Sequence, residues 1–145
     1  MVSALTDARK DLIFLGGDGW GNVGHEFFKV LNGKKIEAYS VSHWHEDLVS
    51  ARSLKFKKRM KSLDRVATDT GVLAYDATML TIEAILQAKV LTREGVEAAL
   101  SKIKKFKGVT GNYQFSPGLL KKSLVVLKIT DDTFKFDRVI EPGSL

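Results

Sequence analysis

Short apolar runs alternate with a helical apolar pattern along the first third of the chain. The run Leu12–Leu15 is continuous and ends at Gly16-Gly17, which predicts a buried parallel strand. Val23–Leu31 has apolar residues at helical spacing, with Asn22 as its N-cap, and Ile36–Val41 is a second strand-like run. We therefore predict a β-α-β unit with parallel strands and a right-handed crossover, after a short helix at residues 2–10.

The middle of the chain predicts three helices. Residues 51–63 form a basic helix with a thin apolar stripe, and residues 69–88 form the strongest helix, with a wide apolar face that requires cover. Thr92 is placed to cap the third helix. The apolar ridge of the strongest helix is predicted at Leu73, Ala77, Leu80 and Ala84. The polar positions assigned to its opposite side are Asp76, Glu83 and Gln87.

The last third of the chain predicts strands. Gly108 and Gly111 bracket a turn before a short strand at residues 112–115. Residues 124–129 and 134–139 read as a β-hairpin that turns at Asp131-Asp132. The fold class is therefore α/β, with a Rossmann-like start, long central helices and a C-terminal hairpin.

Composition narrows the class of protein. The chain has 145 residues, enough for one domain, and its 44% hydrophobic and 28% charged content is ordinary for a globular protein. Cysteine is absent, which excludes disulfides and thiolate metal sites. No run reaches the length of a membrane span, and the acidic Asp7 argues against a signal peptide, so we expect a cytoplasmic location for this chain as it stands.

The turn after the first strand is the candidate ligand site. Asp18 lies beyond a strand end, where open α/β sheets bind ligands, and Trp20 offers an apolar face beside it. A carboxylate next to an aromatic ring suits a small ligand with an ammonium group. The alternative is a structural aspartate that caps a turn and a half-buried tryptophan.

Two other features of the sequence suggest chemistry. A metal site could draw on residues close together in the sequence and one distant histidine, but their spacing is not that of helical zinc motifs, so we predict no metal. These residues are His25, His43, His45, Glu46 and Asp47. The basic helix at residues 51–63 and the net charge of +6 leave open a small α/β protein that binds nucleic acid or a phosphorylated partner. The simpler interpretation of that helix is a solvated surface.

Four segments together resemble the C-terminal part of a bacterial solute-binding protein. The family is the leucine/isoleucine/valine-type binding protein of branched-chain amino-acid ABC transporters, which has a type I periplasmic-binding fold. The segments occur in the family's order. They are FLGGDGWGN at residues 14–22, LAYDATMLTIEAILQA at 73–88, FKGVTGNYQF at 106–115 and LVVLKITDDTFKF at 124–136.

The resemblance implies a non-enzymatic binding protein without a cofactor. It implies that Asp18 contacts the α-ammonium of the bound amino acid and that Gly17, Gly19 and Trp20 line the same turn. The partners it implies are a branched-chain or other small amino acid and an ABC permease, in the periplasm. The chain departs from the family at SPGLLKK after residue 115 and at the hairpin turn, which affects loop geometry rather than the ligand.

Family members are more than twice as long, so the resemblance implies that this chain is a truncated fragment. Its origin is either a natural truncation or an experiment that asks whether half a binding protein folds alone. We expect one compact unit over residues 1–145, with 1–42 and 122–142 equivalent to one family lobe and 43–121 to the other. Ligand binding should be weak or absent, because the resemblance places the rest of the cleft outside this chain. The wide apolar face of residues 69–88 then favours a homodimer.

Overall fold

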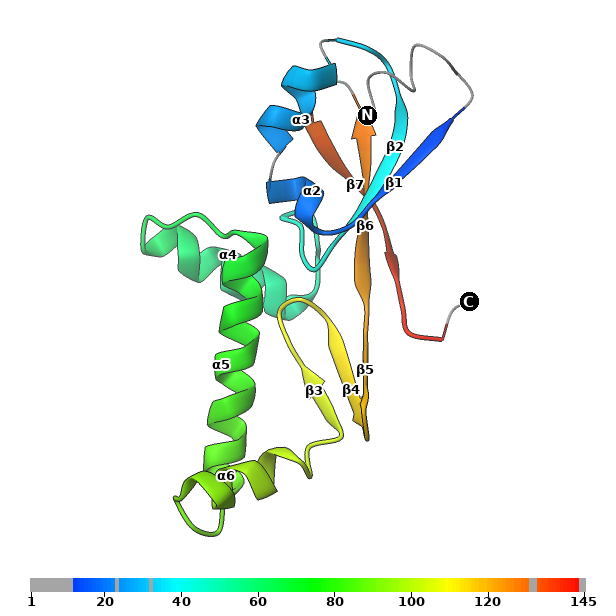
Figure 1. Ribbon diagram of the computed structural model, residues 1–145. Helices are drawn as coiled ribbons and strands as arrows, with labels where there is room; N and C mark the ends of the chain where they lie inside the picture. The colour runs from blue at the N-terminus through cyan, green and yellow to red at the C-terminus, as the bar shows by residue number, and fades with distance from the viewer. Residues whose placement is uncertain (1–11, 23, 32, 131–132, 144–145) are drawn as a thin grey trace. The chain divides into compact units, whose positions relative to one another are not determined.

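The computed structural model describes residues 12–22, 24–31, 33–130 and 133–143 (Figure 1). The helices are α2 (Gly19–Asn22), α3 (Gly24–Leu31), α4 (Ala51–Ser62), α5 (Asp69–Gln87) and α6 (Arg93–Leu100). The strands are β1 (Ile13–Gly16), β2 (Glu37–Ser42), β3 (Lys105–Lys107), β4 (Asn112–Ser116), β5 (Leu119–Lys122), β6 (Leu124–Thr130) and β7 (Thr133–Ile140). Among these described helices, none is both long and apolar enough to cross a membrane.

The chain divides into two units. Unit 1 contains residues 1–45 and 124–140, and unit 2 contains residues 46–123 and 141–145. Unit 1 holds a four-stranded sheet with α2 and α3, and unit 2 holds a three-stranded sheet with α4, α5 and α6. The equivalence of these segments to family lobes stays a prediction.

The sheet of unit 1 has the strand order β1-β2-β6-β7. β1 and β2 are parallel, with Gly16 beside Ser40, so the predicted β-α-β unit is confirmed. β6 and β7 are antiparallel, with a bulge between Val126 and Leu127, which confirms the hairpin. The turn predicted at residues 131–132 and the helix predicted at residues 2–10 lie outside the described residues.

Two sequence predictions for unit 1 are wrong. β1 is not buried, because it lies at the sheet edge, where Ile13 is 58% and Leu15 is 78% exposed. Asn22 does not precede the first helix as its cap, because residues 19–22 themselves form the short helix α2. The sheet buries its apolar side chains on β2 and β6 instead, at Ala38, Val125, Leu127 and Ile129.

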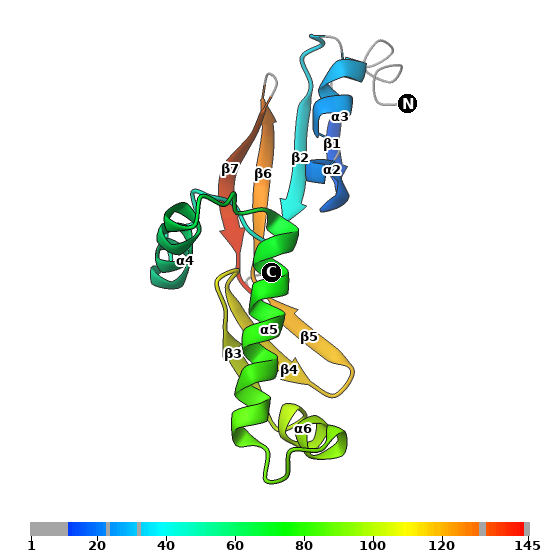
Figure 2. The ribbon, with the colours of Figure 1, turned by 90° about the vertical axis from the view of Figure 1, so that its left-hand side faces the viewer.

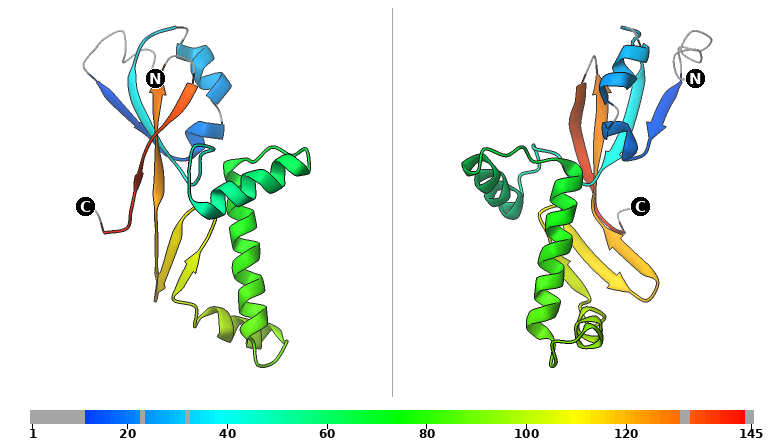
Figure 3. Two further views of the ribbon diagram at one scale, coloured as in Figure 1. Left: turned by 180° about the vertical axis from the view of Figure 1, so that it is seen from behind. Right: turned by 60° about the vertical axis from the view of Figure 1, so that its left-hand side comes forward.

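Unit 2 places α5 alongside the antiparallel sheet β3-β4-β5, with α6 packed at the end of the helix (Figures 1 and 3). The predicted cap of α6 is confirmed, since the Thr92 side chain accepts a hydrogen bond from the Gly95 amide at 3.1 Å. Thr68 caps α5 in the same way through the amide of Gly71. A small core between these helices is formed by Ala84, Ala99 and Ile103, with Leu80, Val96 and Phe115 packed against it.

The buried side of α5 agrees only in part with the predicted ridge, of which Ala84 is buried and Leu80 packs against the small core. Val72, Asp76 and Ala84 are buried, whereas Ala77 is exposed. The helical pattern predicts Asp76 on the polar side opposite the ridge, but it is only 2% exposed. The carboxylate is buried because the turn before β4 supplies the hydrogen-bond donors that a buried charge requires. Large apolar residues are exposed elsewhere on α5, at Tyr75, Met79, Ile82, Ile85 and Leu86.

Candidate functional site

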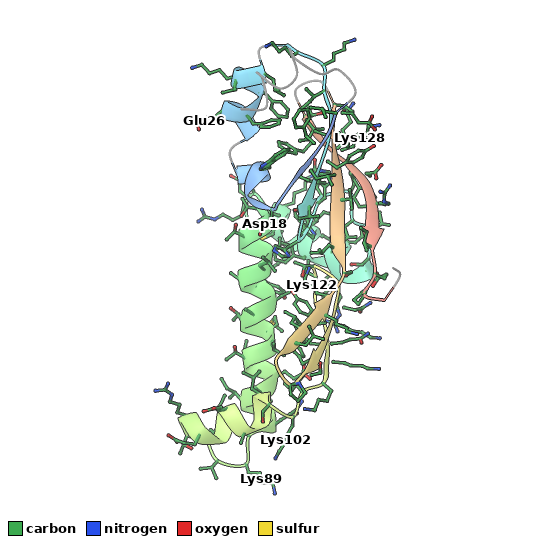
Figure 4. The ribbon with its side chains drawn as sticks, turned by 45° about the vertical axis from the view of Figure 1, so that its right-hand side comes forward. Asp18, Glu26, Lys89, Lys102, Lys122 and Lys128 are labelled. Atoms are coloured by element: carbon green, nitrogen blue, oxygen red, sulfur yellow. The ribbon has the colours of Figure 1, made fainter. Side chains whose placement is uncertain are left out.

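The predicted binding turn lies at the C-terminal end of β1, where Figure 4 labels Asp18. Two backbone hydrogen bonds form a tight turn there. The amide of Trp20 donates to the carbonyl of Gly17 at 3.3 Å, and the amide of Gly21 donates to the carbonyl of Asp18 at 3.3 Å. These bonds begin the short helix α2 and leave the turn compact. The structure thus brings Gly17, Asp18, Gly19 and Trp20 together in one loop.

The Trp20 ring is packed against its own loop. A Cβ atom at Gly16 would overlap the six-membered ring of Trp20, so only glycine fits under this side chain. The ring also lies against Phe27 of α3, at 5.0 Å between centroids. Trp20 is therefore half-buried, with its position set by packing, as the structural alternative had anticipated for this residue.

Asp18 is in a different environment. Its side chain is 62% exposed, and a Cβ atom added at either neighbouring glycine, Gly17 or Gly19, would meet nothing within 4 Å. Open space thus lies beside both glycines, and most of the carboxylate is exposed. A ligand atom could therefore approach the exposed side of Asp18 and the backbone of both glycines.

His43 is the residue of this site that sequence analysis did not assign to it. Its Nε2 lies 3.3 Å from Oδ2 of Asp18. Parallel strands end at the same sheet edge, and His43 directly follows β2 while Asp18 closely follows β1. The parallel pairing predicted from the sequence could have indicated this contact.

The segment after β2 is held by its own hydrogen bonds. The Ser42 hydroxyl donates to the carbonyl of Trp44 at 2.8 Å, and Trp44 is buried. His45 lies beside Phe136 of β7, at 6.1 Å between ring centroids. Within the ranges that the structure describes, no group of three or more His, Asp or Glu side chains could hold a metal, and the side chain of His25 lies outside them.

No known family profile and no curated protein sequence matches the chain. Several solved structures do. Leucine binding protein LivK from Thermotoga maritima is 24% identical, with a TM-score of 0.77 over 99% of this chain and 42% of LivK. The branched-chain amino acid transporter substrate binding protein LivJ from Streptococcus pneumoniae, in complex with isoleucine, is 23% identical, with a TM-score of 0.71 over 97% of this chain and 40% of LivJ.

The chain has part of a periplasmic-binding-protein fold. The predicted fold class is therefore confirmed, as is the resemblance to proteins of branched-chain amino-acid transport at the level of fold. A solute binding protein of an ABC transporter from R. palustris, in complex with benzoate, has the same fold. Its sequence is 19% identical to this chain, with a TM-score of 0.65 over 89% of this chain and 36% of that protein. This chain thus spans less than half the length of each of these three proteins.

Two of the segments that carry the resemblance meet in unit 2 of this periplasmic-binding fold. The buried carboxylate of Asp76, from α5, accepts hydrogen bonds from the amides of Val109 and Thr110, at 2.7 and 2.9 Å. The Thr110 hydroxyl lies 2.8 Å and the Tyr113 hydroxyl 3.1 Å from Oδ2 of Asp76. A Cβ atom at Gly108 would overlap this carboxylate. Asp76 is therefore a structural residue that holds the turn before β4.

Proposed function

We propose that the loop of residues 17–20 binds the ammonium group of a small amino acid of the branched-chain type. The observation that carries this proposal is the exposed carboxylate of Asp18, flanked by two glycines that face open space at the end of β1. Hydrogen bonds between a carboxylate and an ammonium group are about twice as strong as bonds between neutral groups. The chain is then the binding part of an ABC transporter solute-binding protein, rather than an enzyme, and its protein partner is a permease.

The chemistry of Asp18 distinguishes between the ligands seen on this fold. LivJ was solved with isoleucine, which carries an ammonium group, and the R. palustris protein was solved with benzoate, which does not. An exposed carboxylate attracts the first ligand and repels the second. This favours an amino acid over an aromatic acid at this loop.

Affinity should be low. The loop of residues 17–20 and the neighbouring His43 contact a ligand from one side, and much of the ligand surface stays in water. We expect a Kd no better than about 1 mM, which corresponds to about 4 kcal/mol of binding free energy.

A titration monitored by amide NMR tests this function. Leucine, isoleucine and valine should shift the amides of residues 17–20 at millimolar concentration, and benzoate should not. Asp18→Asn should abolish these shifts, whereas the charge-matched control Glu26→Gln, on α3 of the same unit, should retain them (Figure 4). Unchanged binding in Asp18→Asn, or no shift in this loop with any of the three amino acids, would contradict the proposal.

We further propose that the chain forms a homodimer through the exposed apolar side chains of α5. Ile82, Ile85 and Leu86 are exposed on consecutive turns of the helix, and burying each removes about 1.5–3 kcal/mol of unfavourable hydration. Light scattering should find a dimer at micromolar concentration, and Ile82→Glu should convert it to a monomer. A monomeric parent chain would refute this assembly.

A further inference from the structure

The groove between α4, α5 and β3 in unit 2 combines an apolar floor with a basic rim. Its volume is about 600 Å³, within the range of small-molecule sites. Figure 2 shows α4 beside the N-terminal half of α5. All the lining residues belong to unit 2, so the groove shares no residue with the Asp18 loop of unit 1.

The floor of the groove is aromatic and apolar. Phe56 of α4 lies against Tyr75 of α5 at 4.9 Å between ring centroids. Phe56 and Phe106 are largely buried, but Tyr75 remains 43% and Met79 38% exposed. These two side chains leave apolar surface available to a ligand, in the part of the groove that faces solvent.

The rim carries four cations from two elements. Arg52, Lys55 and Arg59 project from α4, and Lys107 ends β3. All four are exposed, and within the described residues none of them forms an ion pair. Spacing along α4 places Arg52, Lys55 and Arg59 on one helix face, since they are three and four residues apart.

Asp76 is the acidic residue of the groove, and its charge is turned inward. The carboxylate receives hydrogen bonds from Val109, Thr110 and Tyr113 and is almost inaccessible to solvent. It therefore offers little repulsion to an anion at the rim. The exposed charge around the apolar floor is positive.

From this arrangement we propose that the groove binds an amphipathic organic anion, with an aryl or alkyl body on Tyr75 and Met79 and a carboxylate or sulfonate at the rim cations. Guanidinium groups bind such anions through paired hydrogen bonds, and aromatic floors bind apolar bodies. A small molecule fits better than nucleic acid, because the cations surround one short groove rather than following an extended track.

Two matched fluorescent probes separate the charge from the apolar body. Anilinonaphthalene sulfonate carries the anion, and N-phenylnaphthylamine has nearly the same body without it. We expect the sulfonate to bind about tenfold more tightly than the neutral probe in low salt. This ratio of affinities should fall as added salt screens the rim cations. Amide NMR shifts caused by the sulfonate should fall on residues 52–63, 75–79 and 106–109.

Paired variants test the rim. Arg52→Gln/Arg59→Gln should weaken binding of the sulfonate by about fivefold and change binding of the neutral probe by less than about twofold. Lys89→Gln/Lys102→Gln lowers the net charge by the same amount but lies outside the groove, as Figure 4 shows, and should leave both affinities unchanged. Asp18→Asn should also have no effect, which keeps this site distinct from the amino-acid loop.

Several results would overturn the proposal. Equal losses in both double variants would mean that net charge alone attracts the probe. Equal affinities for the two probes would mean that the cations do not contribute. Displacement of the sulfonate by an oligonucleotide but not by phenylbutyrate would assign the basic rim to nucleic acid instead.

Discussion

Oδ1 of Asp76 accepts a hydrogen bond from the backbone amide of Val109 at 2.7 Å, between residues 33 apart in the chain. This bond ties α5 to the turn before β4, and Oδ2 adds bonds from Thr110 and Tyr113. Hydrogen bonds to a charged group contribute more than neutral ones, about 1.5–3 kcal/mol each. The arrangement makes Asp76 a principal link between the helices and the sheet of unit 2.

Asp76→Ala should lower the free energy of unfolding of unit 2 by about 3 kcal/mol or more, because it leaves two buried amides without their acceptor and the Thr110 and Tyr113 hydroxyls with only each other. Urea unfolding followed by far-ultraviolet circular dichroism measures this, since α4, α5 and α6 supply most of the helix. Glu97→Gln, at an exposed position of α6, is the control and should change stability by less than about 0.5 kcal/mol. A loss under about 1 kcal/mol in Asp76→Ala would contradict this role.

Gly16→Ala should disturb unit 1, because its methyl group would overlap the Trp20 ring. We expect a cost of about 1–3 kcal/mol and a red shift of tryptophan emission as the ring moves away from Phe27. Both tryptophans, Trp20 and Trp44, belong to unit 1, so fluorescence reports this unit. Gly17→Ala is the matched control, since open space surrounds that position, and similar effects of the two changes would refute the packing argument.

Lys122 should make the stability of unit 2 depend on pH. Burial lowers the pKa of its ammonium group from 10.5 to about 8, against the opposing attraction of Asp76, Asp69 and Glu141. Between pH 8 and 10.5 the unfolded chain keeps a proton that the folded chain has released, so stability should rise with pH across this window. We expect a gain of about 1 kcal/mol, reduced by solvent screening of a partly buried side chain.

The same experiment has an upper limit in pH. Burial raises the pKa of Tyr113 above its ordinary value of 10.0, so above pH 10 the unfolded chain loses a proton that the folded chain keeps, and stability should fall. Urea midpoints measured from pH 7 upward should therefore pass through a maximum near pH 10. Lys122→Met should remove the rise, whereas Lys121→Met, at the exposed neighbouring position, should preserve it.

Thr92→Ala should cost about 1 kcal/mol, because the first turn of α6 loses the hydroxyl that accepts from the Gly95 amide. Thr92→Ser retains the acceptor and should restore most of that stability. Hydrogen exchange at the Gly95 amide gives a local measurement, with faster exchange expected in the alanine variant only. Equal exchange in the two variants would show that the cap does not protect this amide.

Much of this protein follows from local patterns. The apolar runs at residues 12–15 and 36–41 predicted parallel strands, and the hairpin of β6 and β7 followed from alternation, because such patterns express the pleat of a strand directly. The helix caps were equally local, since a threonine hydroxyl and an amide three residues later are close in the sequence. The loop with Asp18 and Trp20 could likewise be placed at a strand end from the sequence.

Tertiary structure decided what depends on distant residues. Asp76 is buried because donors from the turn before β4 satisfy its charge, and helical periodicity contains no information about those donors. His43 reaches Asp18 because the parallel strands β1 and β2 terminate at the same end of the sheet. Leu15 is exposed because β1 is the outermost strand of that sheet. Residue patterns thus determined the longer helices and strands but missed the short elements α2, β3 and β5. Burial and charge pairing were set by contacts that form only when the chain folds.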